Sequence, residues 1–441
     1  MKFKKNPRKK RTLHIVLFLI LFFIVEKTLT VLLEPYTMQA EVDRQLSYWD
    51  AQGVAPDMVA LGDSTVGCGI EPHTLAGEAD GIHFVLNAAS ANQPIEGSYY
   101  YLRYLKKKYP GIRYVVMGLT YDQLIDSQTN MQKKLLLLDR IHDPVIWISY
   151  SRRVLSVEDL PLLLKSYRYR ARIKDIPATV SDKAAKYSDF TPTEDVGYTP
   201  NETRLDPEKG EVGIGDLHWK EDEVDQNSKE ALQNIIDFCA EEGISLTLVT
   251  MPVGDALFYH NEGIDPAHRY IEEIAARNGI IYLDFNLWKQ REEENVDEQM
   301  SDNVHIMHAL STKLTAVLGQ VINGEASDRF LYHSVEEARE QIHGILHVEL
   351  STTLNEDGSR QMSATWIGTD HLKPEFRFLV TDENGKILLD SGRQNESTAV
   401  LPAELVGQKM VCSVTAYASD RNQNYQRTYS ISVDEHTWNQ E

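Results

Sequence analysis

Three residues, far apart in the sequence, have the types that nucleophilic catalysis requires. Ser64 follows an apolar run at 57–62, within the tetrapeptide Gly-Asp-Ser-Thr. A serine hydroxyl is a poor nucleophile at neutral pH, so it needs an adjacent base that is oriented by an acceptor. Asp302 and His305 offer both, because their i, i+3 spacing places a carboxylate beside an imidazole. Asp302 would accept the Nδ1 proton and leave Nε2 facing Ser64.

Each of these motifs has an ordinary explanation when it is taken alone. Gly-Asp-Ser is a common turn sequence, and Asp-x-x-His arises by chance in many chains. His308 is a second candidate base, but it has no acid three residues before it and is expected to pack on a helix. Cys68 lies four residues after Ser64 and is interpreted as a small buried side chain.

The elements around these motifs alternate between short apolar runs and amphipathic segments. Strands are expected at 57–62, 82–90, 112–119, 244–252 and 280–285, and helices at 94–111, 228–243, 265–279 and 309–322. This order predicts an α/β fold, in which a parallel sheet is covered on both faces in three α/β/α layers. Ligands of such sheets bind at the carboxyl ends of the strands, where Ser64, residues 87–92, Tyr121 and residues 251–252 would lie.

Gly-Asp-Ser after the first strand, with Asp-x-x-His before the last helix, resembles the SGNH/GDSL hydrolase superfamily over residues 57–323. The resemblance implies that Ser64 is the nucleophile, that its own backbone N–H is an oxyanion donor, and that Asp302 and His305 complete a triad. The apolar N-terminus brings the chain closer to the DltD-like and alginate O-acetylation-like branch. Proteins of that branch are membrane-anchored and act outside the cytoplasm on cell-surface polymers, often beside a multi-spanning O-acyltransferase.

Two further blocks of the superfamily are altered in this chain. The second block reads Asn-Ala-Ala-Ser-Ala-Asn-Gln-Pro at 87–94, and Asn92 stands where the family has a glycine that donates its N–H. In the third block Tyr121 stands where the family has an asparagine. The resemblance therefore makes Asn92 and Tyr121 the expected additional oxyanion donors, since both can donate hydrogen bonds.

The N-terminus has the composition of a membrane anchor. Residues 1–11 carry seven Lys or Arg and no acid, and residues 13–33 are apolar except for His14, Glu26-Lys27 and two threonines. Twenty-one helical residues span about 30 Å, the thickness of a bilayer core. The basic flank predicts an uncleaved single-pass anchor whose N-terminus is cytoplasmic. A cleaved signal peptide is the alternative, although no A-x-A-like site follows.

Other segments complete the expected organisation. Residues 34–56 are a helical stalk, and 57–330 form the hydrolase-like domain with an insertion at about 125–227. The insertion either packs over the sheet edge or serves as a lid or docking surface. Its glycine-containing stretch 210–216 is interpreted as a flexible loop. A linker helix at 331–344 precedes period-two strands at 345–441, which predict a β-sandwich of immunoglobulin or fibronectin III style.

Composition excludes several classes of function. The formal charge is −21, and such an acidic chain repels nucleic acid. Three scattered cysteines give neither a disulfide framework nor a zinc pattern. The triad chemistry implies no metal or organic cofactor.

The sequence thus predicts an extracytoplasmic serine esterase or O-acyltransferase, with acetyl as the expected acyl group. The expected partners are a cell-wall or secreted polysaccharide as substrate, membrane lipid, and a multi-spanning O-acyltransferase. The alternative is a catalytically inactive scaffold or glycan-binding partner of such an acyltransferase.

Overall fold

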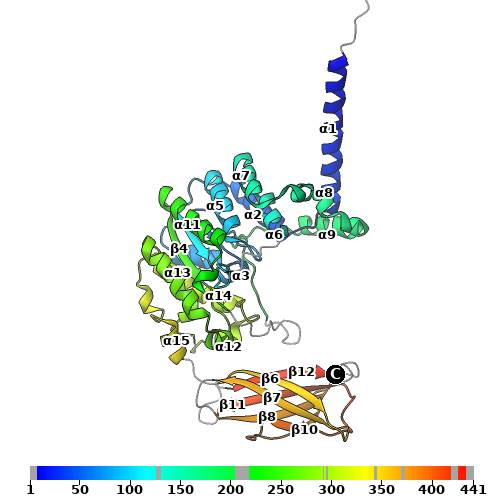
Figure 1. Ribbon diagram of the computed structural model, residues 1–441, viewed down its shortest axis with the longest axis vertical. Helices are drawn as coiled ribbons and strands as arrows, with labels where there is room; N and C mark the ends of the chain where they lie inside the picture. Colours follow the sequence, from blue (N-terminus) through cyan, green and yellow to red (C-terminus); the bar gives the residue numbers. More distant parts are fainter. Residues whose placement is uncertain are drawn as a thin grey trace, which may run out of the picture. The chain divides into compact units, whose positions relative to one another are not determined.

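The computed structural model describes residues 7–125, 131–203, 218–291, 293–294, 296–341, 345–368, 373–418 and 426–433 (Figure 1). The chain divides into two compact units. The first consists of Met1–Gly118, Asp126–Thr199 and Asp225–Leu246. The second consists of Leu119–Ile125, Pro200–Val224 and Thr247–Glu441.

The first unit begins with a long apolar helix, α1 (Pro7–Leu33), as the sequence predicts. Its Arg11–Leu33 portion has a mean hydropathy of 2.5. This segment is long and apolar enough to be a membrane anchor or a signal sequence. A second helix, α2 (Met38–Ala51), occupies the expected stalk but packs onto the domain. Leu46 is buried, and the Trp49 indole donates to Thr193 O at 2.8 Å. The helix expected at 34–56 is thus present, and Val42 and Leu46 are its buried apolar residues.

A five-stranded parallel sheet confirms the predicted α/β class. Its strands are β1 (Met58–Leu61), β2 (Val85–Asn87), β3 (Tyr114–Gly118), β4 (Ser245–Thr250) and β5 (Ile281–Asp284). They lie in the order β2-β1-β3-β4-β5. The strands are almost continuously buried, which is typical of a parallel sheet with helices on its faces.

Helices occur where the amphipathic segments predict them. The first unit contains α3 (Ser64–Gly69), α4 (Pro72–Glu78), α5 (Ile95–Lys108) and α11 (Gln226–Glu241). The second contains α12 (Asp255–His260), α13 (Ile264–Asn278), α14 (His308–Ile322) and α15 (Val335–Gln341), with short 3-10 turns η4 (Phe285–Leu287), η5 (Val296–Gln299) and η6 (Ser327–Arg329). Helix α13 ends at Gly279, which has φ 64° and whose N–H caps the helix.

The expected insertion is mostly helical. It contains α6 (Met131–Arg140), α7 (Pro144–Val154), η1 (Val157–Leu163), α8 (Lys165–Arg168), η2 (Arg170–Asp175), α9 (Ile176–Ser188) and η3 (Glu221–Glu223). Helices α6 and α7 pack on α5, where a Cβ at Gly97 would lie 2.3 Å from Leu137 Cδ1. This part of the insertion therefore packs on a helix of the domain, while its place over the sheet edge and the lid or docking role stay predictions. The loop expected at 210–216 lies outside the described residues.

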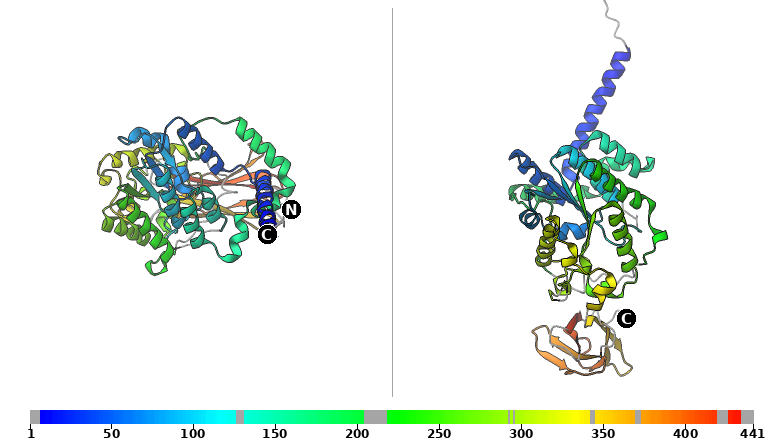
Figure 2. Two further views of the ribbon diagram at one scale, coloured as in Figure 1. Left: turned by 90° about the horizontal axis from the view of Figure 1, so that it is seen from above. Right: turned by 90° about the vertical axis from the view of Figure 1, so that its left-hand side faces the viewer.

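The C-terminal strands form two antiparallel sheets with one apolar core (Figure 2). The strands are β6 (Ile345–Leu354), β7 (Arg360–Gly368), β8 (Pro374–Asp382), β9 (Ile387–Asp390), β10 (Thr398–Leu401), β11 (Met410–Ala418) and β12 (Gln426–Val433). Burial alternates strictly along β11, as a half-buried antiparallel strand requires. A turn that contains Asn384-Gly385 joins β8 to β9, with Gly385 at φ 78°.

Candidate active site

Ser64 lies at the end of β1, at the first position of α3. Asp63 caps this helix, since its Oδ1 accepts hydrogen bonds from the Thr65 N–H at 2.9 Å and the Thr65 hydroxyl at 2.7 Å. Every residue of the stretch 58–72 is buried except Ser64, which is partly exposed. The local fold therefore brings one side chain of this stretch to the surface, and that side chain is the predicted nucleophile.

Two glycines allow α3 to approach the sheet so closely. A Cβ at Gly118, on β3, would lie 1.9 Å from Val66 Cγ2, and one at Gly62 would lie 2.7 Å from the same methyl group. Gly62 also has φ 149°, which favours glycine. Val66 is fully buried in α3, so any side chain at these positions would push α3, and Ser64 with it, away from the sheet.

Asn87, the first residue of the altered second block, holds the other end of α3. Its buried side-chain amide donates to the Val66 and Ile70 carbonyls, each at 2.9 Å. Ile70 caps the C-terminus of α3, where carbonyls commonly lack an intrahelical partner, whereas Val66 O also accepts the Ile70 N–H at 3.1 Å. Asn87 thus has a defined structural task in positioning the short helix that begins with Ser64.

Asn92 lies in a turn next to the Ser64 loop. The Ser90 N–H donates to Gly62 O at 3.2 Å, which joins the two loops side by side. Asn92 is exposed and has φ 51°, the one positive φ of a residue other than glycine among those described. Asparagine tolerates this left-handed region better than most residues do. The backbone at Asn92 therefore has a shape that glycine usually provides, at the position where the resemblance expects a glycine.

The predicted pair of Asp302 and His305 is present in the second unit. His305 Nδ1 and Asp302 Oδ2 are 2.7 Å apart, and Asp302 Oδ1 accepts the backbone N–H of His305 at 2.7 Å and of Val304 at 2.9 Å. The loop is closed by a hydrogen bond from Ser301 N to His305 O at 2.7 Å. The imidazole side chain is 25% exposed, so it remains accessible from solvent.

The Asp302 carboxylate is suited to orient a neutral imidazole. Partial burial raises its pKa, but the hydrogen bonds from His305 and from the Val304 N–H outweigh that effect, and the pKa of Asp302 is lowered. Asp302 is therefore ionised at neutral pH and accepts the Nδ1 proton. This leaves Nε2 as the basic nitrogen.

Ser64 belongs to the first compact unit, and Asp302 with His305 belongs to the second. The hydrogen bond between Ser64 Oγ and His305 Nε2 stays a prediction, as do the catalytic roles. His308 is the first residue of α14 and is partly exposed there, which agrees with its expected place on a helix. Cys68 is buried, as predicted.

Tyr121 is part of a buried polar network that no sequence pattern indicated. Its hydroxyl donates to Asp284 Oδ2 at 2.6 Å and accepts from the Asn286 side-chain amide at 3.0 Å. Asp284 Oδ2 also pairs with His268 Nδ1 at 2.8 Å. Because a hydroxyl has one proton, Tyr121 can donate to an oxyanion only if its bond to Asp284 breaks. That role also stays a prediction.

The sequence alone favours a turn role for Asp284 and leaves His268 as one of several scattered histidines. Asp284 does cap the turn after β5, accepting from Asn286 N at 3.0 Å, but it is 1% exposed and central to the network. Burial raises the pKa of Asp284, yet the hydrogen bond and charge of His268 lower it overall. Burial lowers the pKa of His268, and the bond to Asp284 raises it overall. The pair therefore favours its ionised form.

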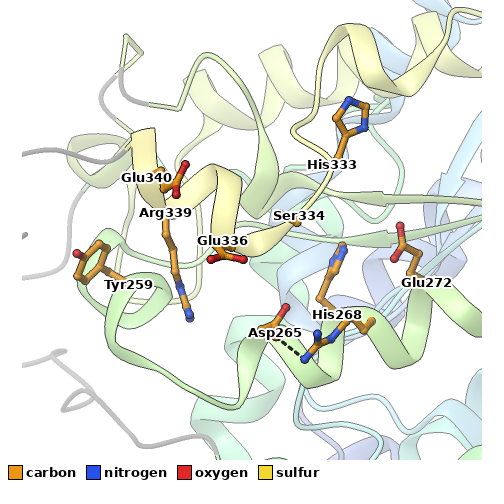
Figure 3. A pocket seen from close by; sticks show the side chains of 10 residues that line it. Tyr259, Asp265, His268, Glu272, His333, Ser334, Glu336, Arg339 and Glu340 are labelled. Atoms are coloured by element: carbon orange, nitrogen blue, oxygen red, sulfur yellow. Dashed lines mark ion pairs between the residues drawn. The ribbon is translucent and has the colours of Figure 1, made fainter.

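A pocket of about 730 Å³ lies beside His268 (Figure 3). It is lined by side chains of both charges: Tyr259, Asp265, His268, Arg269, Glu272, His333, Ser334, Glu336, Arg339 and Glu340. The Arg339 guanidinium is held by the Phe258 and Asn261 carbonyls, and Arg269 pairs with Asp265 at 2.5 Å. Arg269 and Asp265 thus pair within the pocket wall. Neither Ser64 nor His305 is among the lining residues.

Among the described residues, no group of three or more His, Cys, Asp or Glu side chains has the arrangement of a metal site. The absence of a metal or cofactor remains an expectation from the sequence.

Comparison with known proteins does not assign the chain to a family. No model of a known protein family matches it. No curated protein is similar to it at a significant level.

Proposed function

We propose that this chain is a membrane-anchored serine esterase or O-acyltransferase of the SGNH/GDSL type, with Ser64, His305 and Asp302 as its triad. The observation that carries the proposal is the exposure of Ser64 alone within the buried stretch 58–72. The Asp302–His305 hydrogen bond of 2.7 Å supports it, because a triad needs that orientation of the imidazole.

The proposed reaction has two half-reactions. Ser64 Oγ attacks the acyl carbonyl while His305 Nε2 takes the hydroxyl proton, and Asp302 stabilises the imidazolium. The Ser64 backbone N–H and Asn92 would donate to the oxyanion of the tetrahedral intermediate. The leaving alkoxide departs with the proton from His305, and the acyl group remains on Ser64. Water then attacks the acyl carbonyl in an esterase, or a sugar hydroxyl does so in a transferase, and His305 removes the proton of the attacking oxygen. The bond between the acyl carbon and Ser64 Oγ then breaks, and His305 returns the proton to Ser64 Oγ.

The wider architecture suggests where the reaction takes place. Helix α1 is proposed as an uncleaved anchor with its N-terminus in the cytoplasm, so that the remainder of the chain lies outside. A cell-surface or secreted polysaccharide is the proposed substrate, and a multi-spanning O-acyltransferase is the proposed partner. The α/β domain is proposed to have three layers, and the two C-terminal sheets are proposed to form a sandwich of immunoglobulin or fibronectin III style.

One observation favours the alternative of an inactive scaffold. The hydroxyl of Tyr121, an expected oxyanion donor, already donates to Asp284 at 2.6 Å. Loss of one oxyanion donor typically costs a hundredfold or more in rate. A scaffold with this fold would hold a glycan or a membrane acyltransferase without forming an acyl-enzyme.

The test is labelling of the full-length protein with a fluorophosphonate probe, together with hydrolysis of p-nitrophenyl acetate. We expect labelling at Ser64, and a fall of about 10⁴-fold or more in hydrolysis for Ser64→Ala or His305→Ala. Ser149→Ala is the matched control, because Ser149 is also a partly exposed serine of the first unit but lies on α7.

Equal rates for Ser64→Ala and Ser149→Ala would refute the enzymatic proposal and favour the scaffold. If labelling is confirmed, adding an oligosaccharide acceptor distinguishes the two enzyme classes. Transfer of the acyl group to the sugar identifies a transferase, and release of acetate alone identifies an esterase.

A further inference from the structure

The segment 157–188, which we call the collar, consists of η1, α8, η2 and α9. It contacts the C-terminal end of α1, and Figure 1 shows α8 and α9 beside that end of the helix. Both the collar and α1 belong to the first compact unit. The collar follows α6 and α7, the helices of the expected insertion that pack on α5.

Polar bonds join the collar to α1. Glu26, the acid inside the apolar helix, accepts the Ser166 N–H at 3.1 Å and also the Ser166 hydroxyl. Lys165 Nζ lies 2.7 Å from a carboxylate oxygen of Glu34, and Lys183 Nζ donates to Val31 O at 2.8 Å. The collar thus supplies partners for a charge that would otherwise be costly at this depth of a spanning helix.

The collar has almost no core of its own. Thr179 is its one buried residue. Several large apolar or aromatic side chains are exposed instead: Val157 at 83%, Leu160 at 51%, Tyr167 at 42%, Ile173 at 60%, Val180 at 43% and Tyr187 at 55%. Most helices of globular proteins are stabilised by burying an apolar face, so these short helices lack the usual stabilisation within the chain. An external apolar medium would provide it.

The length of the exposed part of α1 indicates that the external apolar medium is the lipid bilayer. Side chains 11–25 are all exposed, and burial along the helix begins at Glu26. Fifteen helical residues span about 22 Å, whereas a bilayer core is about 30 Å thick. If α1 crosses the bilayer, the remaining ~8 Å must come from the turns that follow Val25. The collar surrounds those turns, so it would lie at the boundary between acyl chains and headgroups.

The charge of the collar fits the same location. It carries seven Lys or Arg and four Asp or Glu, whereas the whole chain has a net charge of −21. Basic residues beside exposed apolar side chains are typical of helices that lie in a membrane interface. Tyrosines such as Tyr167 and Tyr187 are enriched at this depth as well.

We propose that the collar is embedded in the membrane. Its exposed apolar side chains would lie among the lipids of the leaflet that contains the C-terminal end of α1. The partner is the lipid bilayer itself, with anionic headgroups next to the basic residues. The inference rests on the anchor in the proposed function but not on the chemistry of Ser64.

The experiment uses the full-length protein in liposomes of phosphatidylcholine and phosphatidylglycerol. Single cysteines at position 173 (Ile173→Cys), 19 (Leu19→Cys) or 387 (Ile387→Cys) carry an environment-sensitive fluorophore. Ile387 is the matched control, because it is 56% exposed against 60% for Ile173 but lies in β9 of the second unit. The three native cysteines are buried, so the unsubstituted protein reports background labelling.

Lipids that carry a nitroxide at a known position then report how deep each fluorophore lies in the bilayer. We expect the label at 173 to be quenched more by a nitroxide near the headgroup than by one at the acyl terminus, and the label at 19 to show the reverse order. The label at 387 should be quenched by aqueous iodide and by neither lipid.

The outcomes separate the collar from the anchor. Quenching of the 173 label by iodide alone, while the label at 19 responds to lipid, overturns the collar proposal and leaves the anchor intact. Loss of lipid quenching at both positions overturns both. Protection of the 173 label in native membranes but not in liposomes also overturns the proposal, because a membrane protein would then be the occupant. If the three variants and the unsubstituted protein melt at the same temperature, the substitutions leave the fold intact.

Discussion

Replacing Gly118 by alanine tests whether the close packing of α3 on the sheet positions Ser64. The added Cβ would lie 1.9 Å from Val66 Cγ2, whereas carbon atoms in contact lie about 3.5–4.0 Å apart. Val66 is fully buried and, as a β-branched residue, has little rotamer freedom in a helix. Gly118→Ala should therefore destabilise the protein by about 1–3 kcal/mol, the usual cost of overpacking a core.

The melting temperature of the full-length protein in detergent measures this cost. At about 2–4 °C per kcal/mol for a domain of 150–250 residues, the transition should fall by about 2–12 °C. Gly67→Ala is the matched control, because Gly67 lies in α3 and a Cβ added there would meet no atom of the described residues within 4 Å. Alanine there should stabilise the helix by about 0.5–1 kcal/mol.

The double variant Gly118→Ala, Val66→Ala separates steric overlap from other effects. Val66→Ala alone removes two buried methyl groups and should cost about 1–3 kcal/mol. In the double variant the overlap is gone, so the two costs should fall short of additivity by about 1 kcal/mol or more. Gly118→Ala should also slow fluorophosphonate labelling of Ser64, and the double variant should recover part of the rate. Additive costs, or a neutral Gly118→Ala, would refute this account of the site.

Three further substitutions test the other parts of the site. Tyr121→Phe should lower the melting temperature, because Asp284 loses a buried hydrogen bond of about 1–3 kcal/mol; a fall of a hundredfold or more in esterase rate per folded molecule would instead assign Tyr121 to the oxyanion hole. Asn87→Ala leaves two carbonyls at the end of α3 without their amide donor and should cost about 1–3 kcal/mol in denaturant titration. Asp302 has a lowered pKa, so its stabilisation is present above the ordinary value of about 3.9 and is lost as the pH falls through the lower folded value. Melting curves of Asp302→Asn should therefore lack that acid-side loss, and an unchanged slope would contradict the lowered pKa.

The periodicity of apolar residues, together with the residues that end helices and strands, predicted most of the fold. The strands were found within the predicted ranges but are shorter, as at 82–90, where β2 covers only Val85–Asn87. The strand ends at Asn87 because the Asn87 side chain bonds to α3 and its backbone N–H bonds to Val196 O. Such contacts come from residues distant in sequence, so a run of apolar residues cannot indicate where the pairing of a strand with its neighbour ends.

The spacing of Asp302 and His305 predicted their hydrogen bond because both residues belong to one short loop. The partnership of Tyr121, His268 and Asp284 had no such signal. The residues Tyr121 and Asp284 are 163 positions apart; Tyr121 lies in the turn after β3, and Asp284 is the last residue of β5. Their contact depends on the strand order β3-β4-β5, which the alternation of helices and strands leaves undetermined. Buried polar networks of this kind are therefore found from the fold and not from spacing.

The two segments that depart from the pattern of the proposed superfamily bear differently on the choice between enzyme and scaffold. At Asn92 the side chain differs from glycine, but φ 51° retains the backbone shape that glycine supplies, so an oxyanion donor can be preserved while the residue changes. At Tyr121 the change is of another kind, because the hydroxyl has been recruited into a network around the buried Asp284. A residue bound in this way stabilises the fold whether or not the site is active. The second block is therefore compatible with catalysis as it stands, and the balance between the two functions depends on whether the Ser64 N–H and Asn92 suffice to hold an oxyanion without Tyr121.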